Sequence, residues 1–285
     1  MAEIFGVVSG AIGVTAIFKQ CVECFEYIQL GRHFSRDFGR CRLKLKIAKR
    51  RLARWGEAVS IDENPRLTVP EPDDTLAQEI KAILEEIVLL FQTINKSSKR
   101  YEIKAPKEDL ECLGDENLEP VFQRLDAQWA KTSSPNQKKP SFVKKTAWAL
   151  YDAKNFEKLI EQVSGFVDDL ENLFPAEEAN RRQLVQREVE DISDEESLVM
   201  LQQTAAGADQ LLADAAKERV MFIYVRNYAR EINGEEKTSI RLGNDWSDSA
   251  LGAATGLKER TFNETDSVSA KGSSTVHVGN RYGSF

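Results

Sequence analysis

Apolar and polar residues follow a helical period along most of the chain. From residue 38 to residue 59, and again from 76 to 94 and from 156 to 174, an apolar side chain returns every third or fourth position. This spacing is typical of helices that bury one face and expose the other. The three stripes are Phe38, Cys41, Leu45, Ala48, Leu52, Trp55 and Val59; Leu76, Ile80, Ile83, Ile87, Leu90 and Ile94; and Phe156, Leu159, Val163, Phe166, Leu170 and Phe174.

Local stop and start signals set the limits of these helices. Asp73 or Asp74 is expected to cap the second helix, and Asp152 is expected to cap the third, which Pro175 ends. Pro120 to Ala130 predicts a short helix before a Pro- and Ser-rich loop. A further single helix is predicted from Leu198, Leu201, Ala205, Ala208, Leu211 and Ala215. It leads into the β-favouring run from Val220 to Val225.

The helix around residues 32–54 is strongly basic. This stretch holds ten Arg or Lys residues and a single acid, Asp37. Such a face either attracts anionic lipid headgroups or pairs with acidic helices of its own domain, and the second arrangement is the commoner one. The acidic stretch from Glu177 to Glu196 is the natural partner.

The start of the chain is uncharged from Ile4 to Phe18. One interpretation is a first helix buried at rest. The other is a segment that is buried at rest and inserts into a membrane later, since Gly6 and Gly10 have the spacing that lets helices approach closely in lipid. Its length of about 22 Å is short of the ~30 Å bilayer core, so insertion would have to include Lys19 and Glu23 or thin the bilayer. The candidate inserting residues are Ile4, Phe5, Val7, Val8, Ile12, Val14, Ile17 and Phe18.

The last quarter of the chain contains a repeat. Residues 227–244 and 263–280 align at an offset of 36 positions (263 − 227 = 36), with Asn at both ends and Gly243 over Gly279. Two charged positions change sign, because Arg230 falls on Asp266 and Glu235 falls on Lys271. Such a repeat is typical of two similar rungs stacked on each other.

Stacking explains these matches. Rungs about 4.8 Å apart place each side chain over its equivalent, so opposite charges attract and Asn can form a ladder over Asn. Glycine before the closing Asn suits a tight corner. The predicted ladder and charge-pair residues are Asn227 with Asn263, Asn244 with Asn280, Arg230 with Asp266, and Glu235 with Lys271. The predicted inward residues are Ala229, Ile232, Ile240, Leu242, Thr265, Val268, Ala270, Val276 and Val278.

Two rungs bury little surface and leave open edges, which further copies of the chain can cover. The repeat is therefore a candidate amyloid-forming segment. The alternative is a disordered tail with a chance repeat, which the Gly- and Ser-rich composition favours in an isolated monomer. Both interpretations hold if the tail is disordered in the monomer and becomes ordered when an amyloid template is present. Because the first rung starts where the last helix ends, the two compete for residues 220–229, as a switch requires.

Composition narrows the function classes. The 285 residues carry a net charge of −7, which argues against nucleic-acid binding. Cys21-Val-Glu-Cys24 lacks a redox context, and a zinc site that adds His33 and Cys41 has irregular spacing, so buried cysteines are the better interpretation. With two histidines, His33 and His277, and no phosphate-binding motif, we expect no enzyme, no catalytic residues, no metal and no cofactor. Glu3 argues against a secretory signal, so a cytoplasmic protein is expected.

Particular motifs resemble the fungal HET-S/HET-s heterokaryon-incompatibility family over nearly the whole chain. They are Phe5-Gly-Val-Val8, Cys24-Phe-Glu-Tyr27, Gln29-Leu-Gly-Arg-His-Phe34, Ile47-Ala-Lys49, Arg51-Leu-Ala-Arg-Trp-Gly-Glu-Ala-Val59, Lys144-Lys-Thr-Ala-Trp-Ala-Leu-Tyr-Asp152, Leu242-Gly-Asn244 and Val278-Gly-Asn280. The resemblance implies an all-α HeLo helical bundle at residues 1–222. It also implies a prion-forming domain at 223–285, disordered as a monomer and a β-solenoid in amyloid, whose repeats are joined by a flexible linker at 245–262.

The resemblance also implies a function. Templating of the repeats by an amyloid partner, either a copy of the chain or a related prion-forming domain, destabilises the helical domain. The released N-terminal segment then binds membrane lipid, permeabilises the cell membrane and kills the cell. The alternative is a non-toxic prion partner that only co-assembles. His33 occupies a position where, in the family, His accompanies the toxic type, and this favours the membrane-permeabilising function. The family pattern also has a third charge pair between the rungs, which is missing here because Lys237 falls on Ser273.

Overall fold

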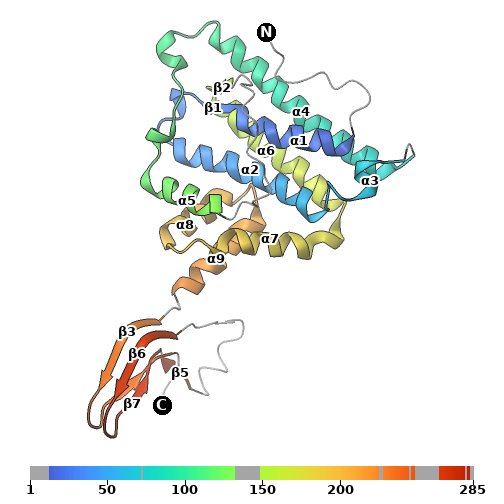
Figure 1. Ribbon diagram of the computed structural model, residues 1–285. Helices are drawn as coiled ribbons and strands as arrows, with labels where there is room; N and C mark the ends of the chain where they lie inside the picture. Colours follow the sequence, from blue (N-terminus) through green and yellow to red (C-terminus); the bar gives the residue numbers. More distant parts are fainter. Residues whose placement is uncertain are drawn as a thin grey trace. The chain divides into compact units, whose positions relative to one another are not determined.

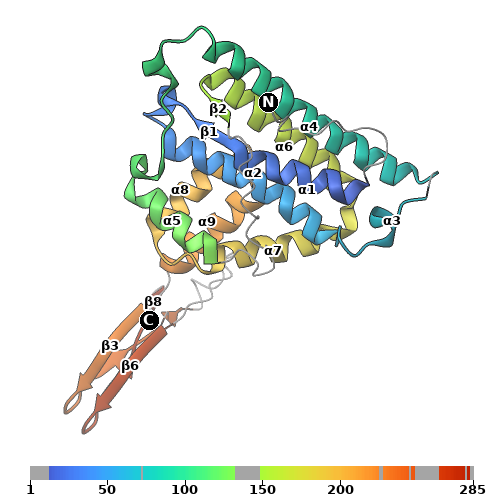
Figure 2. The ribbon, with the colours of Figure 1, turned by 45° about the horizontal axis from the view of Figure 1, so that its top comes forward.

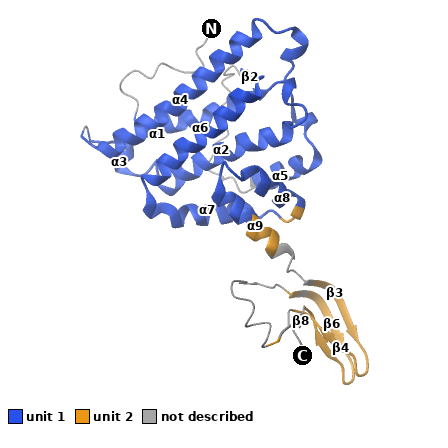
Figure 3. Cartoon of the chain, turned by 180° about the vertical axis from the view of Figure 1, so that it is seen from behind, with its two compact units in different colours: residues 1–192, 196–216 blue, residues 193–195, 217–285 orange. Residues whose placement is uncertain are grey.

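The structure is a computed structural model that describes residues 13–71, 73–131, 148–224, 227–243, 245–247, 263–279 and 281–282. The chain divides into two compact units (Figure 3). The first comprises Met1–Ile192 and Glu196–Ala216, and the second comprises Ser193–Glu195 and Lys217–Phe285.

The first unit is largely helical. Its α-helices are α1 (Val14–Cys24), α2 (Phe38–Ala58), α3 (Pro65–Thr68), α4 (Thr75–Glu102), α5 (Pro120–Lys131), α6 (Ala153–Asn172), α7 (Glu178–Glu190), α8 (Glu195–Ala205) and the start of α9 (Gln210–Tyr224). Short 3-10 turns are η1 (Phe25–Tyr27), η2 (Arg32–Phe34), η3 (Lys107–Leu110), η4 (Asp115–Asn117) and η5 (Pro175–Glu177). The strands β1 (Ile28–Leu30) and β2 (Trp148–Leu150) pair in parallel.

Helices α1, α2, α4 and α6 surround the core of this unit. Helices α1 and α6 both pack against α4, and α2 lies beside α6 (Figures 1 and 2). Trp55 of α2 is fully buried, and its ring lies 5.9 Å from that of Phe18 in α1 and 6.1 Å from that of Phe174. The Trp55 indole N–H donates to the Leu170 carbonyl at 3.0 Å, so its polar atom is satisfied. This tryptophan thus joins α1, α2 and the end of α6.

The predicted helices are present. All seven members of the 38–59 stripe are buried, and α6 ends before Pro175 as expected. The Asp74 side chain accepts from Ala77 N at 3.1 Å and that of Asp152 from Lys154 N at 2.9 Å, which confirms both caps. In the second stripe Leu76 and Ile83 are only half-buried, whereas Leu84 and Phe91 are buried, because α4 packs against both α1 and α6. In the third stripe Phe166 and Phe174 are half-buried.

Three features differ from the prediction. The single helix expected from Leu198 to Ala215 is wrong: α8 ends at Ala205, and Gly207 (φ +85°) turns the chain before α9 starts. The pairing of β1 with β2 was also not expected. In addition, the β-favouring run from Val220 is helical up to Tyr224 in this structure.

The second unit is a stack of parallel strand pairs (Figures 1 and 2). β3 (Asn227–Gly234) pairs with β6 (Asn263–Ala270), β4 (Ser239–Arg241) with β7 (Thr275–His277), and β5 (Asp245–Trp246) with β8 (Arg281–Tyr282). The first two pairs each join a strand of the first repeat to its equivalent in the second, and β5 and β8 continue the same register just beyond the repeats. Most of the predicted 245–262 linker lies outside the described residues.

Candidate functional site: stacked repeats and a buried first helix

The two repeats pair with the register that the sequence predicts. Asn227 pairs with Asn263, Arg241 with His277 and Trp246 with Tyr282, each at an offset of 36 (263 − 227, 277 − 241 and 282 − 246). The repeat in the sequence is therefore a repeat in space. Each repeat forms one rung, and the second lies on the first.

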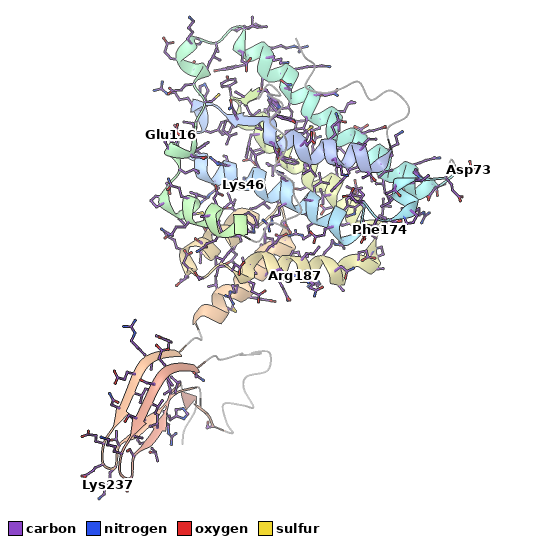
Figure 4. All side chains as sticks on the ribbon, in the orientation of Figure 1. Lys46, Asp73, Glu116, Phe174, Arg187 and Lys237 are labelled. Carbon is purple, nitrogen blue, oxygen red and sulfur yellow. The ribbon has the colours of Figure 1, made fainter. Side chains whose placement is uncertain are left out.

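Glycines form the corners of the rungs. Gly243 (φ +120°) and Gly279 (φ +153°) both have backbones that L side chains rarely adopt, which confirms the predicted tight corners. A Cβ placed on Gly279 would overlap the backbone of Gly243, so the two corners stack with no room for a side chain. At the other end, Gly272 (φ +75°) lies over Glu236, beside Lys237 at the tip of the unit (Figure 4).

Further hydrogen bonds connect the two rungs. Lys271 N donates to the Gly234 carbonyl at 2.7 Å, and Thr275 N donates to the carbonyl of Thr238. The His277 ring nitrogen Nε2 lies 3.0 Å from the Gly243 carbonyl oxygen. These contacts run along the stacking direction, as the strand ladders do. They could be repeated by a further rung of the same sequence.

The predicted inward residues differ in burial within one chain. Ile232 and Val278 are buried, and Ala229, Ile240, Leu242, Thr265 and Val276 are half-buried. Val268 and Ala270 are exposed. A core that includes these two residues would need a second chain to cover them.

The predicted charge pairs are brought to the same level but do not form ion pairs with each other among the described residues. Asp266 instead accepts a hydrogen bond from the Tyr228 hydroxyl at 2.6 Å. Neither Arg230 with Asp266 nor Glu235 with Lys271 is within ion-pair distance in the part of the chain that is described. Asn244 and Asn280 lie outside the described residues. Lys237 and Ser273 occupy the level of the missing third pair.

The described part of the uncharged start lies in a buried helix. Val14, Ile17 and Phe18 of α1 are all buried, as expected for the resting state. The Phe18 ring fills the space beside Gly56 of α2, where a Cβ would collide with it. Ile4, Phe5, Val7, Val8 and Ile12 lie outside the described residues. Of the helices that the structure describes, none has both the length and the apolar character needed to cross a bilayer.

The cysteines of α1 are packed into the helical core. Cys21 and Cys24 are buried free thiols, and Cys21 Sγ donates to the Leu84 carbonyl at 3.2 Å. Burial raises the pKa of the Cys21 thiol well above its ordinary value, and the neighbouring Cys24 adds to the shift. Burial also raises the pKa of Cys41 to about 11. Among the described residues, no group of three His, Cys, Asp or Glu side chains could hold a metal ion.

Acidic residues of the same unit neutralise the basic face of α2. Arg54 Nη1 donates to Glu188 of α7 at 3.0 Å, and Arg50 Nε lies 3.3 Å from the same carboxylate, which confirms the predicted basic–acidic pairing. Burial raises the pKa of Glu188, although Arg54 and Arg50 act against this shift. Further ion pairs join Lys44 to Glu157, Lys46 to Asp126 and Lys49 to Glu26.

Known proteins share both units of this chain. A family described as "Prion-inhibition and propagation" (HeLo) matches residues 6–201, and one described as "Het-s 218-289" matches residues 219–283. "Heterokaryon incompatibility protein S" and "Heterokaryon incompatibility protein s" of Podospora anserina are each 45% identical to the chain over 283 residues, or 99% of this chain and 98% of the relative. The chain belongs to the HET-S/HET-s heterokaryon-incompatibility family.

Solved structures of HET-s also match the helical unit. The HET-s N-terminal domain covers 75% of this chain and is itself covered completely, at 46% identity and a TM-score of 0.70. A double mutant of that domain covers 74% of this chain with the same identity and TM-score. The helical unit therefore has the fold of a HET-s N-terminal domain.

His33, which the HET-S/HET-s resemblance singled out, lies at the edge of an open cavity. Its Nε2 atom is 2.9 Å from the Tyr101 hydroxyl oxygen, and Tyr101 stacks on Tyr151 with ring centroids 5.3 Å apart. The cavity has a volume of about 420 Å³ and is lined by His33, Ser97, Ser98, Tyr101, Tyr151, Asp152, Ala153 and Asn155. Sequence analysis missed this group, because its members come from three distant segments and share no spacing.

Proposed function

We propose that the chain is an amyloid-triggered cell-death effector of heterokaryon incompatibility. The observation that carries this proposal is the place where α9 meets the first rung. Helix α9 ends at Tyr224 and β3 starts at Asn227, so two residues separate the helix from the strand. A rung that grows towards the N-terminus must take residues from α9, which starts in the helical unit.

The input of the switch is the pair of rungs. The register of 36 positions and the open edges of β3 and β6 support a β-solenoid in which each chain adds two rungs to a stack. Partners of this kind are copies of the chain and related prion-forming domains. The exposed Val268 and Ala270 would be covered in such a stack.

The output of the switch is the start of the chain. Phe18 packs against Trp55 and Gly56 of α2, and Val14 and Ile17 of the same helix are buried, so loss of this core would expose all three. Insertion would also carry Lys19, whose ion pair with Asp62 at 2.7 Å is exposed and therefore contributes little. At rest the chain would be cytoplasmic, and after activation it would act at the cell membrane.

The second candidate is a non-toxic prion partner that co-assembles and leaves membranes intact. The composition of α1 favours it, because Lys19 and Glu23 both lie within the eleven residues Val14–Cys24. Two charges in so short a segment oppose entry into lipid. The two candidates share the rungs and differ in what the helical unit does afterwards.

A seeding experiment separates the two functions. The full chain is mixed with vesicles of anionic lipid that contain a self-quenched dye, and fibrils formed from residues 223–285 are added as seeds. The effector predicts dye release that follows fibril growth. Fibril growth without dye release would leave only the prion partner.

A variant tests whether the N-terminal segment causes the release. Replacing Val7 and Val8 by aspartate should abolish the release and leave fibril growth unchanged. Val69→Asp is the matched control, because Val69 is apolar and 80% exposed but lies outside this segment. Equal dye release from both variants would rule out the N-terminal segment as the output.

A further inference from the structure

Two arginines of α2 hold the corner between α8 and α9. Arg51 Nη1 donates to the Ala208 carbonyl at 2.9 Å, and Arg54 Nη2 donates to the Asp209 carboxylate. Ala208 and Asp209 are the two residues immediately before α9, which begins at Gln210. We call Arg51, Arg54, Ala208 and Asp209 the α9 clamp. All four belong to the helical unit.

The charges of the α9 clamp are taken out of water. Arg54 is 3% exposed and Asp209 is 1% exposed, and the only other carboxylate bonded to Arg54 among the described residues is the buried Glu188. A buried guanidinium that loses a carboxylate partner cannot easily replace it with solvent, so opening the contact is costly. We therefore expect the clamp to be either fully formed or fully broken, with partly broken states rarely populated.

Asp209 joins this ion pair to the start of α9. Its Oδ1 atom accepts from Leu212 N at 3.1 Å, as an N-cap does, while its Oδ2 atom accepts from Arg54. If the corner moves away, α9 loses its cap and Arg54 loses a partner in the same step. The two events are coupled through one carboxylate.

Apolar contacts hold the start of α9 weakly. Over residues 210–221 of this helix, where the structure describes the side chains, the buried ones are small apart from one leucine: they are Leu212, Ala213, Ala216 and Val220. From Lys217 onward the chain groups with the strand unit. Alanine buries little apolar surface, so the clamp provides a large share of the attachment of α9 to the helical unit.

The other side of the α9 clamp lies next to the contact that holds α1. Trp55 follows Arg54 in α2, and its ring lies 5.9 Å from that of Phe18 in α1. Loss of charge compensation at Arg54 therefore acts on the segment of α2 against which α1 packs. The clamp connects the helix that leads to the rungs with the helix at the start of the chain.

We propose that the α9 clamp sets the threshold at which rung formation is transmitted to the helical unit. The inference rests on the proposed function, in which β3 grows into the end of α9. A residue spans about 3.3 Å in a strand and 1.5 Å in a helix, so this growth changes the path of the chain that leads back to the clamp. Until Asp209 leaves Arg54, only α9 frays; afterwards α2 and α1 are destabilised together.

Hydrogen exchange of the full chain, measured by mass spectrometry without seeds, tests the clamp directly. Asp209→Asn keeps a side chain that can cap α9 but removes the charge that pairs with Arg54. Amides of α9 should exchange about tenfold faster in this variant, while those of α4 keep their rates. With seeds and anionic vesicles, half-maximal dye release should need fewer seeds.

Asp74→Asn is the matched control. Asp74 also caps a helix, accepting from Ala77 N at 3.1 Å, and also pairs with an arginine, Arg66, but its helix α4 does not lead to the rungs. It should leave α9 exchange and the seed requirement unchanged. Equal effects of the two variants on α9 would overturn the proposal, because they would show a general loss of stability.

A second variant acts on the other arginine. Arg51→Lys keeps the charge and loses the paired geometry that reaches both Glu171 and the Ala208 carbonyl. Arg51→Lys should also accelerate exchange of the α9 amides. This variant keeps the test available if Asp209→Asn does not fold. Unchanged α9 exchange in this variant would overturn the proposal. The proposed function fails separately: it is contradicted if the wild-type chain grows fibrils and releases no dye. The exchange measurement needs neither seeds nor membranes, so its result bears on the clamp alone.

Discussion

Ile232 and Val268 are register partners in the two rungs but differ sharply in exposure: Ile232 is 7% exposed and Val268 is 49% exposed. Both are branched apolar residues at equivalent positions of the repeat. A side chain that is half exposed in one chain contributes little to the stability of that chain. It can contribute much more to an assembly in which a further rung covers it.

Val268→Asp should therefore slow fibril growth of the full chain by about tenfold or more, because stacking would bury an unpaired carboxylate. The measurement is seeded growth followed by thioflavin fluorescence. The melting temperature of the helical unit should not change. Ser269→Asp is the control, since neighbouring residues of a strand point to opposite sides and the register partner of Ser269 is the uncharged Asn233. If both variants slow growth equally, added charge and not the apolar contact is responsible.

Gly279→Ala should prevent formation of the second corner. The backbone there has φ +153°, and a Cβ would overlap Gly243, so the change cannot be absorbed by a side-chain movement. We expect loss of seeded fibril growth in the same assay. Gly165→Ala is the control: Gly165 lies within α6 with nothing within 4 Å of the added Cβ, so this change should stabilise the helical unit by about 0.5–1 kcal/mol. Growth by the Gly279→Ala chain at the wild-type rate would contradict the stacked corner.

Features encoded by neighbouring residues could be predicted from the sequence. Asp74 and Asp152 cap their helices because the capping signal lies within three residues of the helix start. The register of the rungs could be predicted because two segments carry the same pattern, so one comparison of the chain with itself sets the offset.

Features that depend on distant partners could not be predicted. Ile28 pairs with Trp148 across 120 positions (148 − 28 = 120), and neither three-residue strand has a pattern long enough to detect. The acidic segment that pairs with α2 could be predicted as a whole, from Glu177 to Glu196, and Glu188 lies within it. Asp209 lies outside that stretch and pairs with Arg54 only because Gly207 turns the chain back.

The capping aspartate of α4 predicts an acid-dependent loss of stability. The hydrogen bond from Arg66, and then that from the Ala77 N–H, hold the pKa of Asp74 below the ordinary value of 3.8. A depressed pKa stabilises the folded state above the unfolded value and ceases to do so as the pH falls through the folded one. The free energy of unfolding should thus fall below pH 3.8 more steeply in wild type than in Asp74→Asn.

Urea unfolding of the full chain at a series of acidic pH values measures this difference. Asp73→Asn is the control, because Asp73 is exposed and does not cap α4. It should leave the wild-type slope unchanged. Arg66→Ala should raise the pKa of Asp74 towards 3.8, as measured by the NMR titration of its carboxyl group. Wild-type and Asp74→Asn curves that stay parallel below pH 3.8 would exclude a contribution from this cap.

The thiols of α1 report directly on its release. Cys21 and Cys24 are buried, and burial raises the pKa of Cys21, so both the access of a reagent and the thiolate fraction are low. In the resting chain they should react with iodoacetamide about a hundredfold more slowly than the half-buried Cys112. After seeding, the proposed release of α1 should expose both thiols at the rate at which dye leaves the vesicles. Mass spectrometry of the alkylated peptides measures all three sites in one sample, with Cys112 as the internal reference. Vesicles that leak while Cys21 stays protected would show that permeabilisation does not require α1 to leave the core.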